Sequence, residues 1–148
     1  DDGLMAKSMF DADIVLTGIS RTGKTPTSIY LAMLGWKVAN VPLVQGIEPP
    51  EELFLVEPNR VFGLDISTNR LVTHRKKRLS DFGFVDSTTY IDPRTIRYEL
   101  DYALSIFRRG GFSVIKVTNK PIESVANEII EILASHYNEQ SRKKGDRL

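Results

Sequence analysis

The 148-residue sequence predicts an α/β fold, in which helices flank a mainly parallel sheet. Two observations carry this prediction. Short runs rich in β-branched residues alternate along the chain with segments of helical periodicity, which is the order expected of strand–helix–strand units. The first of these runs is apolar at successive positions, as in a strand that is covered on both faces. We expect the connections between such parallel strands to be right-handed.

The first half of the chain predicts one strand–helix–strand unit. Residues 13–17 form the first strand and residues 37–41 the second. The helix between them starts near Pro26 and ends at Gly35, and its apolar residues indicate burial nearly all round. Residues 1–12 are polar and lack a periodic pattern. Because the chain reaches its first methionine only at position 5, we interpret them as a leader from a missing N-terminal half.

The second half repeats the alternation of strands and helices. Its predicted elements are a strand over 61–66, a helix over 67–82 closed by Gly83, a helix over 93–109, a strand over 113–117 and a helix from residue 122. Ser67 or Thr68 can cap the first of these helices, and Asp92 followed by Pro93 is a strong start for the second. Residues 138–148 are strongly polar, so we expect a frayed tail there.

Composition excludes several classes of protein. The 20 basic and 19 acidic side chains leave a net charge of +1, which argues against a dedicated nucleic-acid binder. Without cysteine, the chain can hold neither a disulfide framework nor a thiolate zinc site, and it fits a reducing compartment. No apolar run is long enough to cross a bilayer and no signal peptide is visible, so we expect no association with a membrane.

One segment carries most of the functional information. Residues 18–25 match the pattern G-x-x-x-x-G-K-[ST] without a mismatch, directly after a predicted strand and directly before a predicted helix. Its glycines allow a tight turn that points N–H groups at phosphate oxygens, and the helix adds its positive end. The alternative is a glycine-rich turn with an exposed lysine. The candidate nucleotide-binding residues are Gly18, Ile19, Ser20, Arg21, Thr22, Gly23, Lys24 and Thr25.

Two side chains of this phosphate-binding loop (the P-loop, residues 18–25) have predicted chemical roles. Lys24 can reach the outer phosphate of a nucleotide, and the Thr25 hydroxyl can bind Mg²⁺. A P-loop nucleotidase also needs an acidic residue at the end of a neighbouring strand. Asp65 is the strand-end candidate, and the alternative is a turn or cap residue. The guanine-reading motif of a GTPase is not evident, because residues 118–121 lack the aspartate that usually follows the lysine.

The residues around the P-loop resemble the pyruvate, phosphate dikinase regulatory protein family and the similar phosphoenolpyruvate synthase regulatory proteins. The runs 18–32 and 37–44 carry the resemblance, which extends from the first residues to about Leu133. Serine-Arg-Thr-Gly-Lys-Thr-Pro followed by Val-Ala-Asn-Val-Pro-Leu-Val is far more specific than a bare P-loop. Further matches are Asp1-Asp2-Gly3, Val61-Phe62-Gly63-Leu64, Arg75, Arg78, Tyr90, Arg97, Glu99, Val117-Thr118-Asn119-Lys120 and Glu123.

The resemblance implies a bifunctional serine/threonine kinase and phosphorylase. The kinase takes phosphate from ADP, places it on a threonine of the dikinase beside its phosphohistidine, and leaves AMP. The phosphorylase uses inorganic phosphate to remove that group and releases pyrophosphate. The expected ligands are therefore ADP, inorganic phosphate and Mg²⁺. The expected protein partner is pyruvate, phosphate dikinase or phosphoenolpyruvate synthase, in the cytoplasm, and a homodimer is one expected assembly.

The resemblance also marks candidate residues outside the loop. Asp2 matches an acidic pair of the family, so Asp2 and Lys24 are the candidate catalytic residues; Asp2 would be a base or metal ligand, or a solvated aspartate. Arg75 and Arg78 lie one turn apart and are candidates for contact with phosphates or with the partner, the alternative being a solvated helix face. Lys120 can reach the P-loop edge of the sheet, or be a loop lysine.

Two other functions stay open at this point. One is a generic P-loop protein, either an ATP-dependent small-molecule kinase or a nucleotide-binding module, which nucleotide preference would distinguish. The other is a binding and dimerisation piece whose catalysis requires the missing half. On each of these hypotheses, residues 13–137 form the P-loop domain, and on the resemblance this is the kinase and phosphorylase domain.

Overall fold

The computed structural model describes residues 2–82 and 88–145, and its centre is a sheet of four parallel strands. The strands are β1 (Ile14–Gly18), β2 (Val38–Pro42), β3 (Val61–Asp65) and β4 (Ser113–Lys116). Their order in the sheet is β2-β1-β3-β4. The chain therefore leaves β1 in one direction to form β2 and returns on the other side of β1 to form β3. This topological switch between β1 and β3 is where parallel α/β sheets place their ligands.

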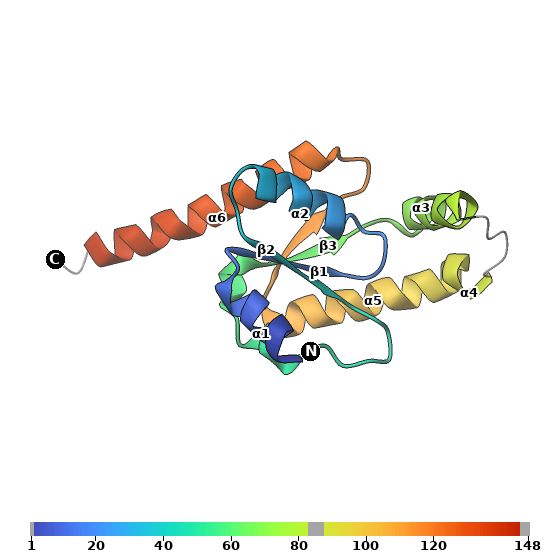
Figure 1. Ribbon diagram of the computed structural model, residues 1–148, viewed down its shortest axis with the longest axis horizontal. Helices are drawn as coiled ribbons and strands as arrows, with labels where there is room; N and C mark the ends of the chain where they lie inside the picture. The colour runs from blue at the N-terminus through green and yellow to red at the C-terminus, as the bar shows by residue number, and fades with distance from the viewer. Residues whose placement is uncertain (1, 83–87, 146–148) are drawn as a thin grey trace.

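Helices cover both faces of the sheet, which confirms the predicted fold class (Figure 1). Helices α2 (Lys24–Met33) and α6 (Ile122–Gly145) pack together on one face. Helices α1 (Asp2–Asp11) and α5 (Pro93–Gly110) lie on the other (Figure 1). Helix α3 (Thr68–Asp81) and the short α4 (Thr88–Ile91) pack against α5 beyond the end of the strands. Two 3-10 helices, η1 (Glu51–Phe54) and η2 (Pro58–Arg60), precede β3.

Two apolar cores hold the layers together. Strand β1 is buried at all five positions, so its side chains contribute to both cores. Leu16 packs with Ile129 on the α2/α6 face, and Val15 belongs to the core on the α5 face. Gly63 of β3 leaves room for the ring of Phe107, because a Cβ atom there would lie 2.6 Å from ring carbons. This close approach seats α5 on the sheet.

Both predicted helix caps are present at the start of α3 and α5. The Ser67 side chain accepts a hydrogen bond from the N–H of Arg70, and the Asp92 side chain accepts one from the N–H of Thr95. Gly83, predicted to close α3, lies outside the described residues. Helix α3 follows directly after β3 and lies beyond the edge of the sheet that carries the P-loop (Figure 1).

The structure corrects the sequence-based prediction at both ends of the chain. Residues Asp2–Asp11, expected to be irregular, form α1. Met9 is the one fully buried side chain of this helix among its described residues, so the sequence carries too short an apolar stripe to reveal it. The predicted frayed tail is also helical over its described residues, since α6 continues to Gly145. Glutamate, glutamine, arginine and lysine are good helix formers, so this stretch continues α6.

Helix α2 is less buried than its apolar sequence indicates. Thr27 and Leu31 are its buried residues, whereas Ile29, Met33 and Leu34 are more than half exposed. The reason is that α2 contacts the sheet and α6 along one face only, so the remaining apolar side chains reach the surface. Over the described ranges, no helix combines the length and the apolar character required to cross a membrane.

Candidate phosphate-binding site

The P-loop connects the carboxyl end of β1 to the first turn of α2, as its sequence predicts. Three residues in it have a positive φ: Gly18 with 152°, Arg21 with 69° and Gly23 with 96°. Gly23 is the N-cap of α2, where a glycine adopts this conformation without the strain of a side chain. Left-handed and right-handed residues in succession turn their N–H groups toward one side, which creates a concave anion-binding surface. The unpaired N–H groups of the first helical turn add to it.

Hydrogen bonds within the loop fix its shape. The carbonyl oxygen of Ile19 accepts two of them, from the Thr22 hydroxyl at 2.9 Å and from Lys24 Nζ at 2.7 Å. Thr22 is buried and Lys24 is half-buried. Burial, together with the nearby guanidinium groups of Arg75 and Arg21, lowers the pKa of Lys24 to about 8. A bound phosphate group would place a negative charge beside the Lys24 ammonium and so stabilise its protonated form.

A cleft of about 460 Å³ opens in front of the P-loop. Its walls come from the loop and the start of α2, from one face of α3, and from the β4–α6 connection with the start of α6. The lining residues are Arg21, Thr22, Gly23, Lys24, Thr25, Pro26, Thr27, His74, Lys77, Arg78, Asp81, Val117, Lys120, Ile122 and Val125. The cleft thus has a polar entrance that is mostly basic and an apolar wall where α6 begins.

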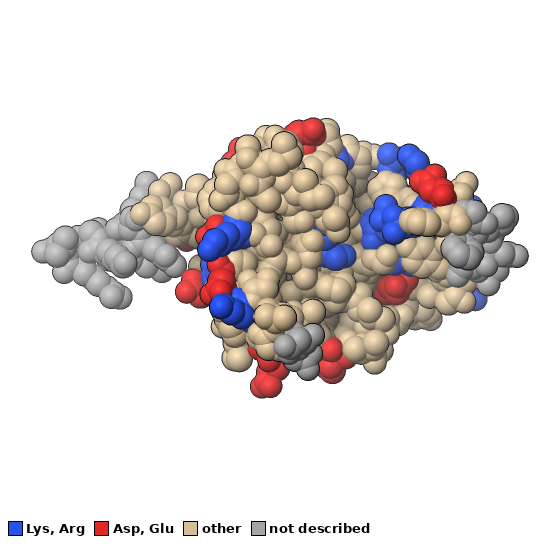
Figure 2. Space-filling model, in the orientation of Figure 1, with Lys and Arg blue, Asp and Glu red and all other residues tan. Residues whose placement is uncertain are grey.

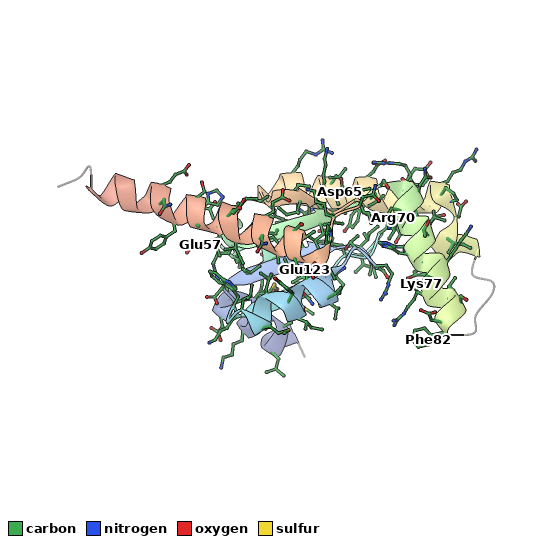
Figure 3. The ribbon with its side chains drawn as sticks, turned by 90° about the horizontal axis from the view of Figure 1, so that it is seen from above. Glu57, Asp65, Arg70, Lys77, Phe82 and Glu123 are labelled. Atoms are coloured by element: carbon green, nitrogen blue, oxygen red, sulfur yellow. The ribbon has the colours of Figure 1, made fainter. Side chains whose placement is uncertain are left out.

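Basic side chains dominate the charge around this cleft. On the face shown in Figure 2, Lys and Arg side chains gather at the end of the molecule that carries α3, with acidic side chains beside them. Among the lining residues, Arg21, Lys24, Lys77, Arg78 and Lys120 are basic, and Asp81 is the one carboxylate. Lys77 lies midway along α3 (Figure 3). A positive cleft attracts phosphate groups even though the net charge of the chain is close to zero.

The two arginines that the resemblance singles out have different surroundings. Arg78 lines the cleft and stacks over the ring of Phe82, at 4.3 Å from Cζ to the ring centroid. Arg75 is 1% exposed and forms an ion pair with Glu99, at 2.7 Å between Nη1 and Oε2. The alternative of a solvated helix face is therefore wrong for Arg75. The Arg75 side chain turns inward toward Glu99 of α5, whereas Arg78 lines the cleft, so the two arginines do not share one surface although they lie one turn apart.

The acidic candidates from the sequence do not lie in the described walls of the cleft. Asp65 ends β3 near the start of α3 (Figure 3), and its charged neighbours are Arg97 and Asp101 of α5 and Lys116 of β4. Burial raises the pKa of Asp65, against the effect of an Ile66 hydrogen bond and those positive charges. Asp65 thus faces α5. The backbone of Asp2 begins α1, and its side chain lies outside the described part of the chain.

Lys120 lies at the predicted edge of the sheet and lines the cleft with the P-loop residues. Its Nζ also forms an ion pair with Glu128 of α6 at 3.0 Å, and both side chains are more than a third exposed. A pair with this exposure is weak, so Lys120 can exchange its carboxylate partner for a phosphate oxygen at little cost. The left-handed conformation of Asn119, with φ 57°, turns the chain just before it.

Sequence reasoning missed three residues of α3 that line the cleft: His74, Lys77 and Asp81. The signal is present in the sequence, because positions 74, 77, 78 and 81 recur at the spacing of one helical face. It also missed that Glu99 and Tyr90 surround Arg75. No local pattern could have revealed that contact, since Glu99 lies 24 residues further along the chain.

The donor set at the cleft fits a magnesium ion that is bound together with a nucleotide. Over the residues that the structure describes, no group of three or more His, Asp or Glu side chains could hold a metal without other ligands. Thr25 and Asp81 both line the cleft and offer the hard oxygen ligands that Mg²⁺ prefers. Mg²⁺ usually completes its coordination with waters and substrate phosphates, so a small number of protein ligands is the expected arrangement.

Together, the parallel sheet, the switch point beside β1 and the loop–helix turn define an α/β protein with a P-loop nucleotide-binding fold. The family that matches is more specific. The chain belongs to the kinase/pyrophosphorylase family, whose profile covers residues 1–130.

Similar proteins from several bacteria carry the name pyruvate, phosphate dikinase regulatory protein. One from Desulfotalea psychrophila is 41% identical over 97% of this chain and 51% of its own length. One from Geotalea uraniireducens is 48% identical over 88% of this chain and 49% of its own length. One from Chloroflexus aurantiacus is 43% identical over 94% of this chain and 50% of its own length. The chain therefore spans about half the length of the curated relatives it matches.

Proposed function

We propose that this chain carries the nucleotide site of a regulatory protein kinase and phosphorylase that acts on pyruvate, phosphate dikinase. The observation that carries the proposal is the P-loop itself, whose Lys24 faces a basic cleft at the switch point of the sheet. Membership of the kinase/pyrophosphorylase family and the names of the similar proteins support the same reaction class.

In the kinase direction, the β-phosphoryl group of ADP is transferred to a threonine hydroxyl. The bond between the β-phosphorus and the oxygen that bridges to the α-phosphate breaks, and AMP leaves. The threonine oxygen forms the new bond to phosphorus, and its proton passes to a base. Phosphoryl transfer depends mainly on alignment and on neutralising charge, and the P-loop N–H groups with the Lys24 ammonium offer both. Mg²⁺ would neutralise further charge on the phosphates, with Thr25 as its ligand.

In the phosphorylase direction, inorganic phosphate attacks the phosphorus of phosphothreonine. A new P–O–P bond forms, the bond to the threonine oxygen breaks, and that oxygen regains a proton. Pyrophosphate and free threonine are the products. Pyrophosphate and the phosphates of ADP present the same chemistry to the P-loop, so one phosphate cradle serves both directions. Lys24 is the residue that both directions share.

Two carboxylates are candidates for the base in the kinase direction. Asp81 lines the cleft opposite the P-loop. Asp2 remains the candidate from the resemblance, and its side chain lies outside the described residues. A base must lie within hydrogen-bonding reach of the threonine hydroxyl. The face of α3 that carries Asp81 also offers His74, Lys77 and Arg78, which suit an acidic or phosphorylated segment of the protein substrate.

The experiment that tests the proposal is a comparison of phosphate donors. The chain is incubated with dikinase that carries phosphohistidine, in the presence of either ADP or ATP, and phosphothreonine and AMP are measured. We expect ADP to support threonine phosphorylation with release of one AMP per phosphothreonine. Transfer from ATP alone would refute the proposal and favour a generic ATP-dependent kinase. The same assay with phosphoenolpyruvate synthase distinguishes the two protein substrates.

A further inference from the structure

Arg75 is the one charged side chain among the described residues that is fully buried. Its guanidinium group contacts three segments that are distant in the sequence. It donates two hydrogen bonds to the Glu99 carboxylate of α5, at 2.7 Å from Nη1 and 3.2 Å from Nη2. Nη1 also donates to the carbonyl oxygen of Tyr90 at 3.0 Å, and the guanidinium carbon lies 4.5 Å from the centre of the Tyr90 ring.

The third contact of Arg75 is with the P-loop. Nη2 donates a hydrogen bond of 3.3 Å to the carbonyl oxygen of Ser20. A second contact reinforces this one, because the hydroxyl groups of Ser20 and Tyr90 lie 3.2 Å apart. Ser20 directly precedes Arg21, the residue whose left-handed backbone shapes the anion-binding concavity. The contacts of Arg75 and Tyr90 thus hold Ser20, the residue directly before Arg21, whose left-handed backbone conformation is unfavourable for a residue with a side chain.

We propose that Arg75 is the positioning residue of the phosphate loop: held by Glu99 and Tyr90, it fixes the carbonyl of Ser20 so that the loop keeps its phosphate-binding shape without a ligand. An arginine suits this task because its planar fork donates to several acceptors in one geometry, whereas a lysine is a compact charge without a fork. The inference rests on the proposed function only in treating the loop as a phosphate site.

The test replaces Arg75 with lysine, which keeps the positive charge and removes the fork. Arg109→Lys is the matched control, because Arg109 also pairs with a glutamate, Glu48, and also stacks over a ring, that of Phe54, but does not line the cleft. The first measurement is the backbone order parameter of the Arg21 and Thr22 N–H groups in the ligand-free chain. The second is the affinity for ADP by titration calorimetry.

In the wild-type chain and in Arg109→Lys, we expect order parameters near 0.85, the value of rigid backbone, and in Arg75→Lys we expect values below about 0.6. We expect ADP affinity to fall about tenfold in Arg75→Lys and to stay unchanged in the control. A purely structural role would lower stability without loosening the loop. Unchanged order parameters, or unchanged ADP affinity, in a folded Arg75→Lys chain would overturn the inference.

A second variant covers the case in which Arg75→Lys does not fold. Tyr90→Phe keeps the ring under the guanidinium and removes only the hydroxyl that contacts Ser20. We expect it to lower the order parameters at Arg21 and to weaken ADP binding about twofold to fivefold; no change in either would count against the inference. A wild-type chain that does not bind ADP would refute the proposed function, and the order parameters would still decide the role of Arg75.

Discussion

Replacing Glu99 with glutamine removes one charge from a buried ion pair with almost no change of shape. The Glu99 carboxylate accepts hydrogen bonds from both terminal nitrogens of Arg75, and the exposed fractions of the two side chains are 19% and 1%. The substitution therefore leaves the guanidinium charge buried without a carboxylate. Its Nε already lacks a partner, so Arg75 depends on its remaining contacts with backbone carbonyls.

The expected loss of stability follows from this burial. Removing one partner of a buried ion pair costs about 3–5 kcal/mol, because the other charge is left uncompensated. Glu99 retains some contact with water, and the glutamine oxygen can still accept one hydrogen bond, so we expect a loss of about 2–4 kcal/mol. For a chain of this length each kcal/mol corresponds to about 2–4 °C, so the Tm should fall by roughly 5–15 °C.

Urea unfolding followed by circular dichroism measures this loss. The matched control is Asp101→Asn on the same helix, which removes a carboxylate from the exposed ion pair with Arg97. We expect the control to leave the free energy of unfolding unchanged within error, since exposed pairs contribute little. If Glu99→Gln lost less than about 1 kcal/mol, or no more than the control, the reasoning that Arg75 is buried and dependent on Glu99 would be refuted.

Three further predictions follow from the site and the core. The affinity for ADP should fall as the pH rises through the Lys24 pKa of about 8, by up to about tenfold per pH unit above it: Lys24 of the free chain loses its proton there, whereas a bound phosphate keeps Lys24 protonated. Calorimetry across this range checks the sign, and a rise would contradict it. Gly63→Ala should lower the free energy of unfolding by about 1–3 kcal/mol, because the Cβ atom of the alanine would lie 2.6 Å from the Phe107 ring. Urea unfolding of this variant at the same midpoint as the wild-type chain would contradict this prediction. Either Asp2→Asn or Asp81→Asn should slow threonine phosphorylation at least about 100-fold, and unchanged rates in both would exclude both bases.

Local patterns in the sequence predicted most of the fold. The strands are short runs rich in β-branched residues between turn residues, and the caps at Ser67 and Asp92 are side chains that bond within three residues. The P-loop was recognisable because its motif includes the residues that make its turn, such as Gly23. These features depend on neighbours in the sequence, so sequence reasoning could find them.

Contacts between distant residues account for what the sequence did not reveal. A basic run such as residues 74–78 is typical of a solvated helix, and only the packing of α3 on α5 buries Arg75 beside Glu99. The exposure of Ile29 and Met33 likewise depends on which faces of α2 find partners. Asp65 ends a strand as a metal partner would, yet the alternation of side chains along β3 directs it toward α5.

The claim that one phosphate cradle serves both reactions is tested most directly by Lys24→Ala, assayed in both directions. Lys37→Ala is the control, since Lys37 is exposed and precedes β2 at the opposite edge of the sheet. With both variants shown to be folded, we expect Lys24→Ala to slow ADP-dependent phosphorylation and phosphate-dependent release of pyrophosphate by about 100-fold or more each, and the control to match wild type. Pyrophosphate release at the wild-type rate in Lys24→Ala would contradict the shared cradle.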